Sequence, residues 1–145
     1  MTMPIRSIEL FTGAGGLALG LEQAGCHHEA MFEFNAQACD TIRYNISHGQ
    51  PLTHGWKIFQ TDVRDVRYAE LVNSIELVAG GPPCQPFSMG GKARGRDDAR
   101  DMFPEAVRSV RELQPKCFVF ENVKGLLRES FASYFNYIIL QLSFP

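Results

Sequence analysis

The chain has 145 residues, of which 45% are hydrophobic and 21% are charged, an ordinary composition for one globular domain with a buried core. Its net charge of −2 excludes a generally basic protein that coats nucleic acid, although a local basic groove stays possible. The longest apolar stretches fall short of the roughly 20 residues that a membrane-spanning helix needs. The first residues lack the apolar region of a secretory signal. We therefore expect a cytoplasmic chain that is neither secreted nor inserted in a membrane.

Short apolar runs alternate with amphipathic stretches along the whole chain, and Asn35 and Ser130 are expected to cap helices while Gly25 ends one. The pattern predicts strands at residues 5–11, 29–34, 56–60, 76–79 and 117–121. It predicts helices from the turn at residues 12–16 to about residue 24 and at residues 35–45, 103–113 and 131–142, with a short helix within 63–72. Strands that alternate with helices indicate an open, mostly parallel, Rossmann-like α/β sheet with helices on both faces. Ligands of such sheets bind at the carboxyl ends of the strands.

The end of the chain is informative about the completeness of this fold. A helix after a strand in this pattern is usually a crossover to a further parallel strand, but here only residues 143–145 follow the last helix. We therefore expect a fold that is incomplete at its carboxyl end, with an open sheet edge and exposed apolar residues on the last helix.

A glycine-rich turn follows the first predicted strand. Residues 13–18 match the G-x-G-x-x-G/A pattern, in which a ligand approaches the backbone closely and faces helix N–H groups. Glu33 lies 20 residues beyond Gly13 and could accept hydrogen bonds from ribose hydroxyls. Asp62, after the third strand, is either an acceptor for an adenine amino group or a solvated loop acid. NAD and S-adenosylmethionine fit this turn equally well, and a tight turn without a ligand is the third alternative.

The segment at residues 80–88 carries three prolines and two glycines, which fix an irregular backbone around Cys84. A thiolate is a strong nucleophile, especially where positive neighbours lower the pKa of its thiol. Basic residues follow closely at 92, 94, 96 and 100, although the acidic residues 97, 98 and 101 offset much of their charge. A structural loop cysteine is the alternative. The cysteines at 26, 39 and 117 are expected to be buried small hydrophobes, and their spacing indicates neither a zinc site nor a disulfide framework.

Several ordered motifs together resemble the cytosine-5 DNA methyltransferases. They are Phe11-Thr12-Gly13-Ala14-Gly15-Gly16, then Glu33 and Asp62, the string Gly81-Pro82-Pro83-Cys84-Gln85-Pro86-Phe87-Ser88, and Glu121-Asn122-Val123. The resemblance covers residues 1–145 as the amino-terminal part of a catalytic domain. It implies the fold of S-adenosylmethionine-dependent methyltransferases and favours S-adenosylmethionine as the cofactor. The family's target recognition region and later motifs would lie beyond residue 145.

The resemblance also implies roles for individual residues. Cys84 would add to carbon 6 of a flipped-out cytosine, and Glu121 would supply a proton at N3, so that carbon 5 can attack the methyl group. Asn122 would support the loop that carries Cys84. The cofactor would be bound by Phe11, Gly13, Gly15, Gly16, Leu17, Glu33, Phe34, Asp62, Val63, Pro83 and Phe103, with Met102 nearby. The substrate would be bound by Gln85, Ser88, Lys92, Arg94, Arg96 and Asn122.

Double-stranded DNA is the implied partner, in DNA methylation of the restriction–modification type, in the cytoplasm or at the nucleoid of a bacterium. A second chain could carry the missing recognition region, and we expect negligible turnover by the 145 residues alone. Three alternatives are a tRNA cytosine-5 methyltransferase, a NAD-binding oxidoreductase and a non-catalytic regulatory subunit of the same fold.

Overall fold

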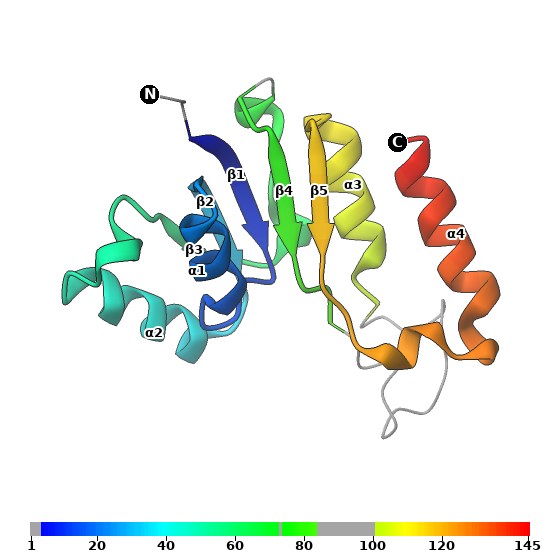
Figure 1. Ribbon diagram of the computed structural model, residues 1–145, viewed down its shortest axis with the longest axis horizontal. Coiled ribbons are helices and arrows are strands. Elements are labelled where there is room, and N and C mark those ends of the chain that lie inside the picture. The colour runs from blue at the N-terminus through cyan, green and yellow to red at the C-terminus, as the bar shows by residue number, and fades with distance from the viewer. Residues whose placement is uncertain (1–3, 73, 84–100) are drawn as a thin grey trace.

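The computed structural model of the chain, which describes residues 4–72, 74–83 and 101–145, contains a five-stranded parallel sheet (Figure 1). Its strand order is β3-β2-β1-β4-β5, so the direction of winding reverses between β1 and β4. The strands are β1 (Ile5–Leu10), β2 (Cys26–Glu33), β3 (Ile58–Gln60), β4 (Leu77–Gly80) and β5 (Cys117–Phe120). The helices are α1 (Gly16–Gln23), α2 (Ala36–Ser47), α3 (Phe103–Leu113) and α4 (Ala132–Ser143). The predicted fold class is therefore confirmed.

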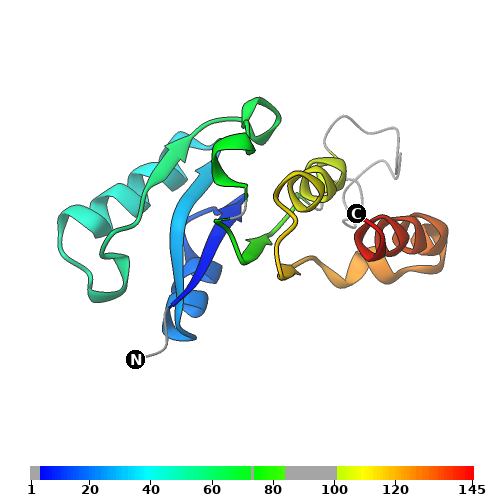
Figure 2. The same cartoon turned by 90° about the horizontal axis from the view of Figure 1, so that it is seen from above.

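Helices cover both faces of the sheet, as the view from above shows (Figure 2). On one face, Met31 of β2 packs with residues of α1 and α2 and with Trp56. On the other face, Ile8, Leu10 and Phe32 pack against α3 and α4 in a larger core. No helix within the described ranges is long and apolar enough to cross a membrane.

Strand β2 begins at Cys26, three residues before the predicted start at Glu29. The register with β1 shifts there, because Ser7 pairs with His28 but Ile8 pairs with Ala30. Glu29 is the extra residue of this bulge. The bulge breaks the alternation of polar and apolar residues, so the period-2 pattern could not reveal the first three residues of the strand. The predicted caps at Asn35 and Gly25 are confirmed: the Asn35 side chain accepts from the Ala38 amide at 3.0 Å, and Gly25 follows α1 with φ at 92°.

The carboxyl-terminal part of the chain, from β5 to α4, differs from two expectations. Cys117 is exposed, whereas Cys26 and Cys39 are buried as expected, because the helices α1 and α2 cover β1 to β3 and leave this face of β5 open. Ser130 does not cap α4, because it lies inside a 3-10 turn, η6 (Glu129–Phe131), that leads into the helix. Ile139 and Leu140 of α4 are about half exposed, as expected for a helix with an uncovered apolar side.

Strands β1 and β4 approach each other so closely that one position admits only glycine. A β-carbon on Gly80 would lie 2.5 Å from the backbone oxygen of Leu10, far inside van der Waals contact. This contact lies at the point where the winding reverses, and the two glycine-containing loops leave the sheet from here. The spacing of β1 and β4 therefore depends on the missing side chain at residue 80.

We expect Gly80→Ala to lower the free energy of unfolding by about 3 kcal/mol, because the added methyl group meets rigid backbone rather than a flexible side chain. Denaturant unfolding of the two proteins measures this difference. Gly20→Ala is the matched control, since a β-carbon there meets nothing within 4 Å. Because Gly20 lies inside α1, that substitution should be neutral or stabilising by up to about 1 kcal/mol. Equal effects of the two substitutions would contradict the close approach.

Candidate active site

The turn after β1 adopts a backbone that brings several amide groups to the carboxyl edge of the sheet. Phe11, Gly13 and Gly15 all have positive φ angles, 55°, 57° and 91°. Gly15 also packs inward, because a β-carbon on it would lie 3.4 Å from the Trp56 ring and 3.5 Å from Ile42. The α1 helix then begins at Gly16 with no side chain capping its first turn. The amino end of α1 and the turn therefore form one rigid unit.

The carboxylate of Glu33 ties this turn to the end of β2. One oxygen accepts from the Gly13 amide at 2.8 Å, and the other accepts from the Asn35 amide at 2.6 Å. Each carboxylate oxygen has a further lone pair to offer. Glu33 can therefore hold the turn and still accept hydrogen bonds from the hydroxyl groups of a bound ligand.

A cavity of about 530 Å³ opens beside Glu33. Six of the predicted cofactor residues and Met102 line it, together with four residues that were not predicted to bind the cofactor. The ring of Phe34 is 74% exposed over this cavity, so it is available to cover a ligand. The full lining is Phe11, Phe32, Glu33, Phe34, Asn35, Thr61, Asp62, Val63, Arg64, Pro83 and Met102. An apolar wall beside a carboxylate suits an adenine ring with its ribose.

Asp62 forms part of the far wall and is held in place by its neighbour Arg64. Its carboxylate accepts from the Arg64 amide at 2.9 Å and from two guanidinium nitrogens at 3.0 and 2.5 Å. These hydrogen bonds hold the pKa of the Asp62 carboxyl below its usual value. Asp62 is therefore an ionised acceptor rather than a freely solvated loop acid.

Five other predicted cofactor residues lie outside the lining of this cavity: Gly13, Gly15, Gly16, Leu17 and Phe103. Gly13 reaches it through its hydrogen bond to Glu33. Phe103 is buried in the core at the start of α3, so its neighbour Met102 takes the place on the wall.

The end of β5 brings Glu121 and Asn122 to the segment that leads toward Cys84. The Glu121 amide donates to the Gly80 oxygen at 2.9 Å, and a β-carbon on Gly81 would lie 3.5 Å from Glu121 Oε2. The Asn122 side chain donates to the Pro82 oxygen at 2.8 Å. The next residue, Pro83, lines the cavity. Residues 80–83 therefore connect Glu121 and Asn122 to the predicted cofactor pocket.

The predicted nucleophile Cys84 lies outside the described residues. The same holds for the predicted substrate residues Gln85, Ser88, Lys92, Arg94 and Arg96.

A buried polar cluster beneath the turn was not predicted. Glu9 is 1% exposed, and its carboxyl group faces the Ala18 amide in the first turn of α1, with Oε2 lacking a hydrogen-bond partner among the described residues. His28 Nε2 lies 3.1 Å from the Ala18 oxygen and 4.0 Å from the Glu9 carboxylate, while its Nδ1 lies 3.0 Å from the Ser7 hydroxyl. Burial raises the pKa of Glu9 to about 8 and lowers the pKa of His28. An acidic residue between Ile8 and Leu10, just before the glycine turn, was the available signal.

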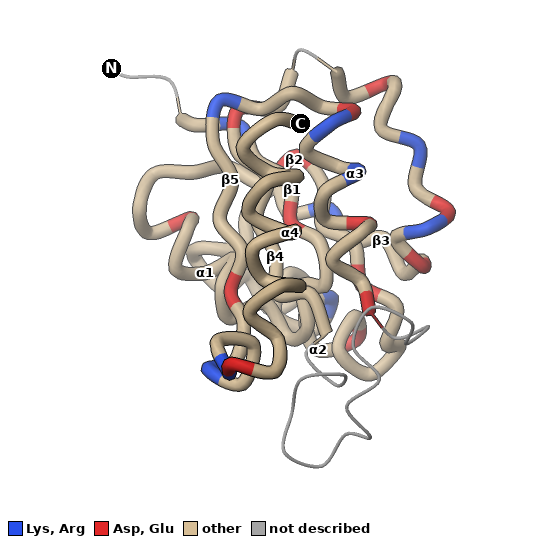
Figure 3. Tube along the Cα trace, turned by 90° about the vertical axis from the view of Figure 1, so that its right-hand side faces the viewer, with Lys and Arg blue, Asp and Glu red and all other residues tan. Residues whose placement is uncertain are grey.

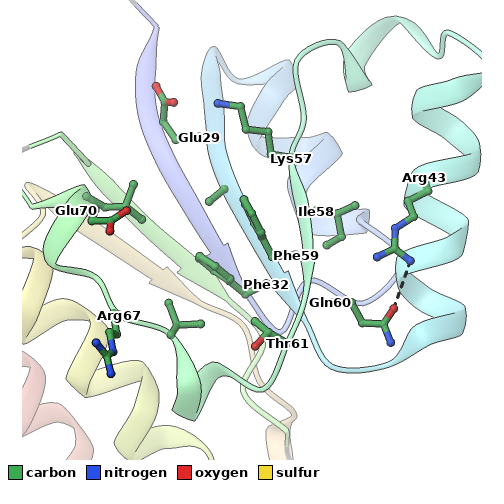
Figure 4. Close-up of a pocket in the computed structure, with 13 residues that line it drawn as sticks. Glu29, Phe32, Arg43, Lys57, Ile58, Phe59, Gln60, Thr61, Arg67 and Glu70 are labelled. Atoms are coloured by element: carbon green, nitrogen blue, oxygen red, sulfur yellow. Dashed lines mark hydrogen bonds between the residues drawn. The ribbon is translucent and has the colours of Figure 1, made fainter.

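A second, larger hollow of about 700 Å³ lies along β3 (Figure 4). It shares Phe32 and Thr61 with the first cavity, and Phe32 stacks on Phe59 at 5.6 Å between ring centroids. Charges of both signs surround it, including Lys57, Arg67 and Glu70. No predicted site residue lines it, so the candidate site is the smaller cavity at the carboxyl edge.

The fold is that of the S-adenosylmethionine-dependent methyltransferases, and comparisons with known proteins define the family. Residues 5–144 match the family of C-5 cytosine-specific DNA methylases, and the chain belongs to this family. It is 45% identical to the type II methyltransferase M.NgoMIV of Neisseria gonorrhoeae over 97% of its own length, which is 43% of that protein. It is 40% identical to M.AquIA of a Picosynechococcus strain over 99% of its length, which is 58% of that protein.

A solved structure described as a DNA modification methyltransferase encoded within a prophage (E. coli) superimposes with a TM-score of 0.73. It is 30% identical, and the match covers 96% of this chain and 38% of that one. The chain thus spans about half the length, or less, of these relatives. Family membership also argues against the alternative of a NAD-binding oxidoreductase.

The Glu9 carboxyl predicts how stability depends on pH. In the folded chain it keeps its proton up to about pH 8, whereas in the unfolded chain it loses it near pH 4.5, so the free energy of unfolding should fall as the pH rises between these values. The lowered pKa of His28 acts in the opposite direction below about pH 6.5. The effect of Glu9 is therefore unopposed between about pH 6.5 and 8, where a slope of order 1 kcal/mol per pH unit is expected.

We expect Glu9→Gln to flatten this slope, because the amide can still accept from Ala18 and does not ionise. Denaturant unfolding at pH 6.5, 7.2 and 8.0 measures it. The exposed Glu129→Gln is the control and should keep the original slope. A Glu9→Gln protein with an unchanged slope would show that Glu9 is ionised in the fold.

Proposed function

We propose that this chain is the cofactor-binding and catalytic part of an enzyme that transfers a methyl group from S-adenosylmethionine to carbon 5 of cytosine in DNA. The observation that carries the proposal is the course of residues 80–83. This segment is bonded to Glu121 and Asn122 on one side and lines the cavity beside Glu33 through Pro83 on the other. The segment at residues 80–83 therefore joins the cavity that would hold the cofactor to the two residues that would act near the base.

The cavity fits the adenosyl group by its chemistry. Phe11, Val63 and Met102 offer an apolar surface for a purine, and Phe34 can cover its open side. Glu33 would accept from the ribose hydroxyls, and Asp62 would accept from the adenine amino group. When bound, S-adenosylmethionine supplies an electrophilic methyl group. Glu33, Asp62 and Glu121 also make this edge acidic, which favours a cationic sulfonium over an anionic dinucleotide.

The proposed reaction begins at Cys84. Its thiolate adds to carbon 6 of the cytosine, and the electron pair of the 5,6 double bond moves to carbon 5. Carbon 5 would take the methyl group as the bond between that methyl group and the sulfonium sulfur breaks, leaving S-adenosylhomocysteine. Glu121 would stabilise the charge that the addition pushes onto N3 by donating a proton or a hydrogen bond there. Transfer of the carbon 5 proton to water then expels the thiolate from carbon 6 and restores the double bond. Asn122, through Pro82, holds the segment before Cys84 in register with Glu121.

Double-stranded DNA is the proposed substrate, with its cytosine flipped out of the stack. Ser88, Lys92, Arg94 and Arg96 would contact phosphates, and Gln85 the extruded base or its strand. The open β5 edge and the exposed apolar residues of α4 are a surface on which the rest of the catalytic domain, in the same polypeptide or in a second chain, would pack. We place the complete enzyme in a bacterial cytoplasm and in a restriction–modification system. If the complete enzyme incorporated methyl groups into tRNA instead of DNA, the chain would be part of a tRNA cytosine-5 methyltransferase.

Cofactor binding is the first prediction of this proposal. Calorimetry with the 145-residue chain should show binding of S-adenosylmethionine but not of NAD, and Glu33→Ala should weaken it by about tenfold or more, because a carboxylate acceptor is lost. Glu29→Ala is the matched control on the same strand, since Glu29 pairs with Arg6 at 3.0 Å, away from the cavity. Binding of NAD, or an equal loss in both variants, would contradict the cofactor assignment.

The catalytic roles are tested separately. In an assembled enzyme that contains the carboxyl-terminal part, Cys84→Ala should abolish methyl transfer to DNA, and Glu121→Gln should reduce kcat by about a hundredfold or more while the affinity for S-adenosylmethionine stays unchanged. The 145-residue chain alone should show no turnover above its own Cys84→Ala control. Full activity of the assembled Cys84→Ala enzyme would favour the non-catalytic alternative.

A further inference from the structure

We propose that Arg108 of α3 is a positioning residue for the cofactor cavity. Its guanidinium fixes the backbone of residues 62–66, so that Asp62 and Val63 face the adenine. The inference rests on the proposed function, since it assigns the far wall of the cavity to an adenine ring. It goes beyond that function because Arg108 itself does not line the cavity.

The Arg108 guanidinium bridges two backbone carbonyl groups of this wall. Its Nη2 donates to the Val63 oxygen at 2.8 Å, and its Nη1 donates to the Val66 oxygen at 3.2 Å. Val63 is the first residue of the short 3-10 turn η2 (Val63–Asp65), and Val66 is the residue that caps its carboxyl end. A planar fork of donors can hold two carbonyl groups at a fixed spacing, which a lysine ammonium does not reproduce.

The guanidinium is itself held from three sides. Nε donates to Glu105 at 2.7 Å, and Nη1 also donates to Glu112 at 3.1 Å, from residues one turn before and after it on α3. The carbon at its centre lies 4.9 Å from the centroid of the buried Tyr68 ring. Its orientation is therefore set by α3 and by Tyr68, both of which belong to the large core.

The segment that Arg108 contacts contains no α-helix among the described residues. Only short 3-10 turns, η2 and η3 (Ala69–Leu71), connect β3 to β4 in the described residues, where α1 and α2 follow the first two strands. The Thr61 amide donates to the Glu33 oxygen at 2.9 Å, and beyond it the two Arg108 hydrogen bonds join the backbone of this segment to a long helix. The Val63 side chain is 4% exposed, and among the described residues the Asp62 carboxylate is hydrogen-bonded to Arg64, two residues on. Arg108 therefore fixes this segment, the side of the cavity proposed to face the adenine, relative to α3.

The test compares two ligands that differ only at the purine: S-adenosylhomocysteine and its inosine counterpart, which carries an oxygen in place of the amino group. The wild-type chain should prefer the adenine ligand by about tenfold or more, because an ionised Asp62 accepts from the amino group but repels the purine oxygen. In Arg108→Lys this preference should fall to about twofold or less, while affinity for the inosine ligand changes little. A merely structural role would weaken both ligands equally.

The control is Arg111→Lys, on the same helix, where the guanidinium contacts Gln141 of α4 instead. It should keep the wild-type preference. Glu105→Gln retains the Arg108 guanidinium but removes the carboxylate to which Nε donates, and it should lower the preference partway. If Arg108→Lys does not fold, the preference measured in Glu105→Gln tests the proposal in its place. An unchanged preference in the folded variants, or an equal loss for both ligands, would overturn the proposal.

Hydrogen exchange separates this proposal from the cofactor assignment. Without any ligand, the amides of residues 61–68 should exchange about tenfold faster in Arg108→Lys than in wild type, and those of α1 should not change. If the wild-type chain bound neither ligand, the cofactor assignment would fail while this measurement still tested the link between Arg108 and the wall. Unchanged exchange in residues 61–68 would overturn the role of Arg108 whatever the chain binds.

Discussion

The contact between Gly80 and the Leu10 backbone oxygen fixes the distance between the two central strands, and the candidate site is built outward from it. Both strands end at this contact, and each continues at once into one of the loops that carry the site. The turn after β1 lies at the carboxyl edge, where Glu33 accepts from its Gly13 amide, and the segment after β4 leads through Pro83 to Cys84. A parallel sheet whose winding reverses at this point leaves a crevice between the two loops. The closeness of β1 and β4 decides how wide that crevice is.

Acidic side chains then fix the turn through its backbone amides. Glu33 accepts from the Gly13 amide at 2.8 Å, and the buried Glu9 carboxyl group lies beneath the first turn of α1. Positive partial charge at the amino end of a helix stabilises an ionised carboxylate such as that of Glu33, and a protonated carboxyl group can still accept a hydrogen bond through its carbonyl oxygen. The two groups differ in burial, so that Glu33 keeps lone pairs for a ligand while the proton on Glu9 avoids a buried charge. The turn is thereby rigid before any ligand arrives, which lowers the entropic cost of binding.

Local signals predicted the parts of the fold that local chemistry determines. The cap at Asn35, the glycine after α1 and the apolar periods of the strands need no partner elsewhere in the chain, and the structure confirms them. The start of β2 and the exposure of Cys117 depend on a bulge and on which strands the helices cover, so they were missed. In the site, ordered motifs led to Glu33, Asp62 and Pro83. Arg108 gave no such signal, because its carbonyl partners lie more than 40 residues away.

Under the proposed function, the distribution of charge explains how one small domain can serve a cationic cofactor and an anionic polymer. Residues 84–100 contain four basic and two acidic residues, so they contribute +2 while the rest of the chain carries −4. Along the trace of the described part, acidic and basic residues are interspersed rather than gathered by sign (Figure 3). Glu33, Asp62 and Glu121 lie at the carboxyl edge, where they would attract a sulfonium and repel phosphates. Under the proposed function, attraction for DNA therefore has to come from residues 84–100 and from the carboxyl-terminal part of the enzyme, and the acidic edge keeps the phosphate backbone away from the cofactor while a single base enters.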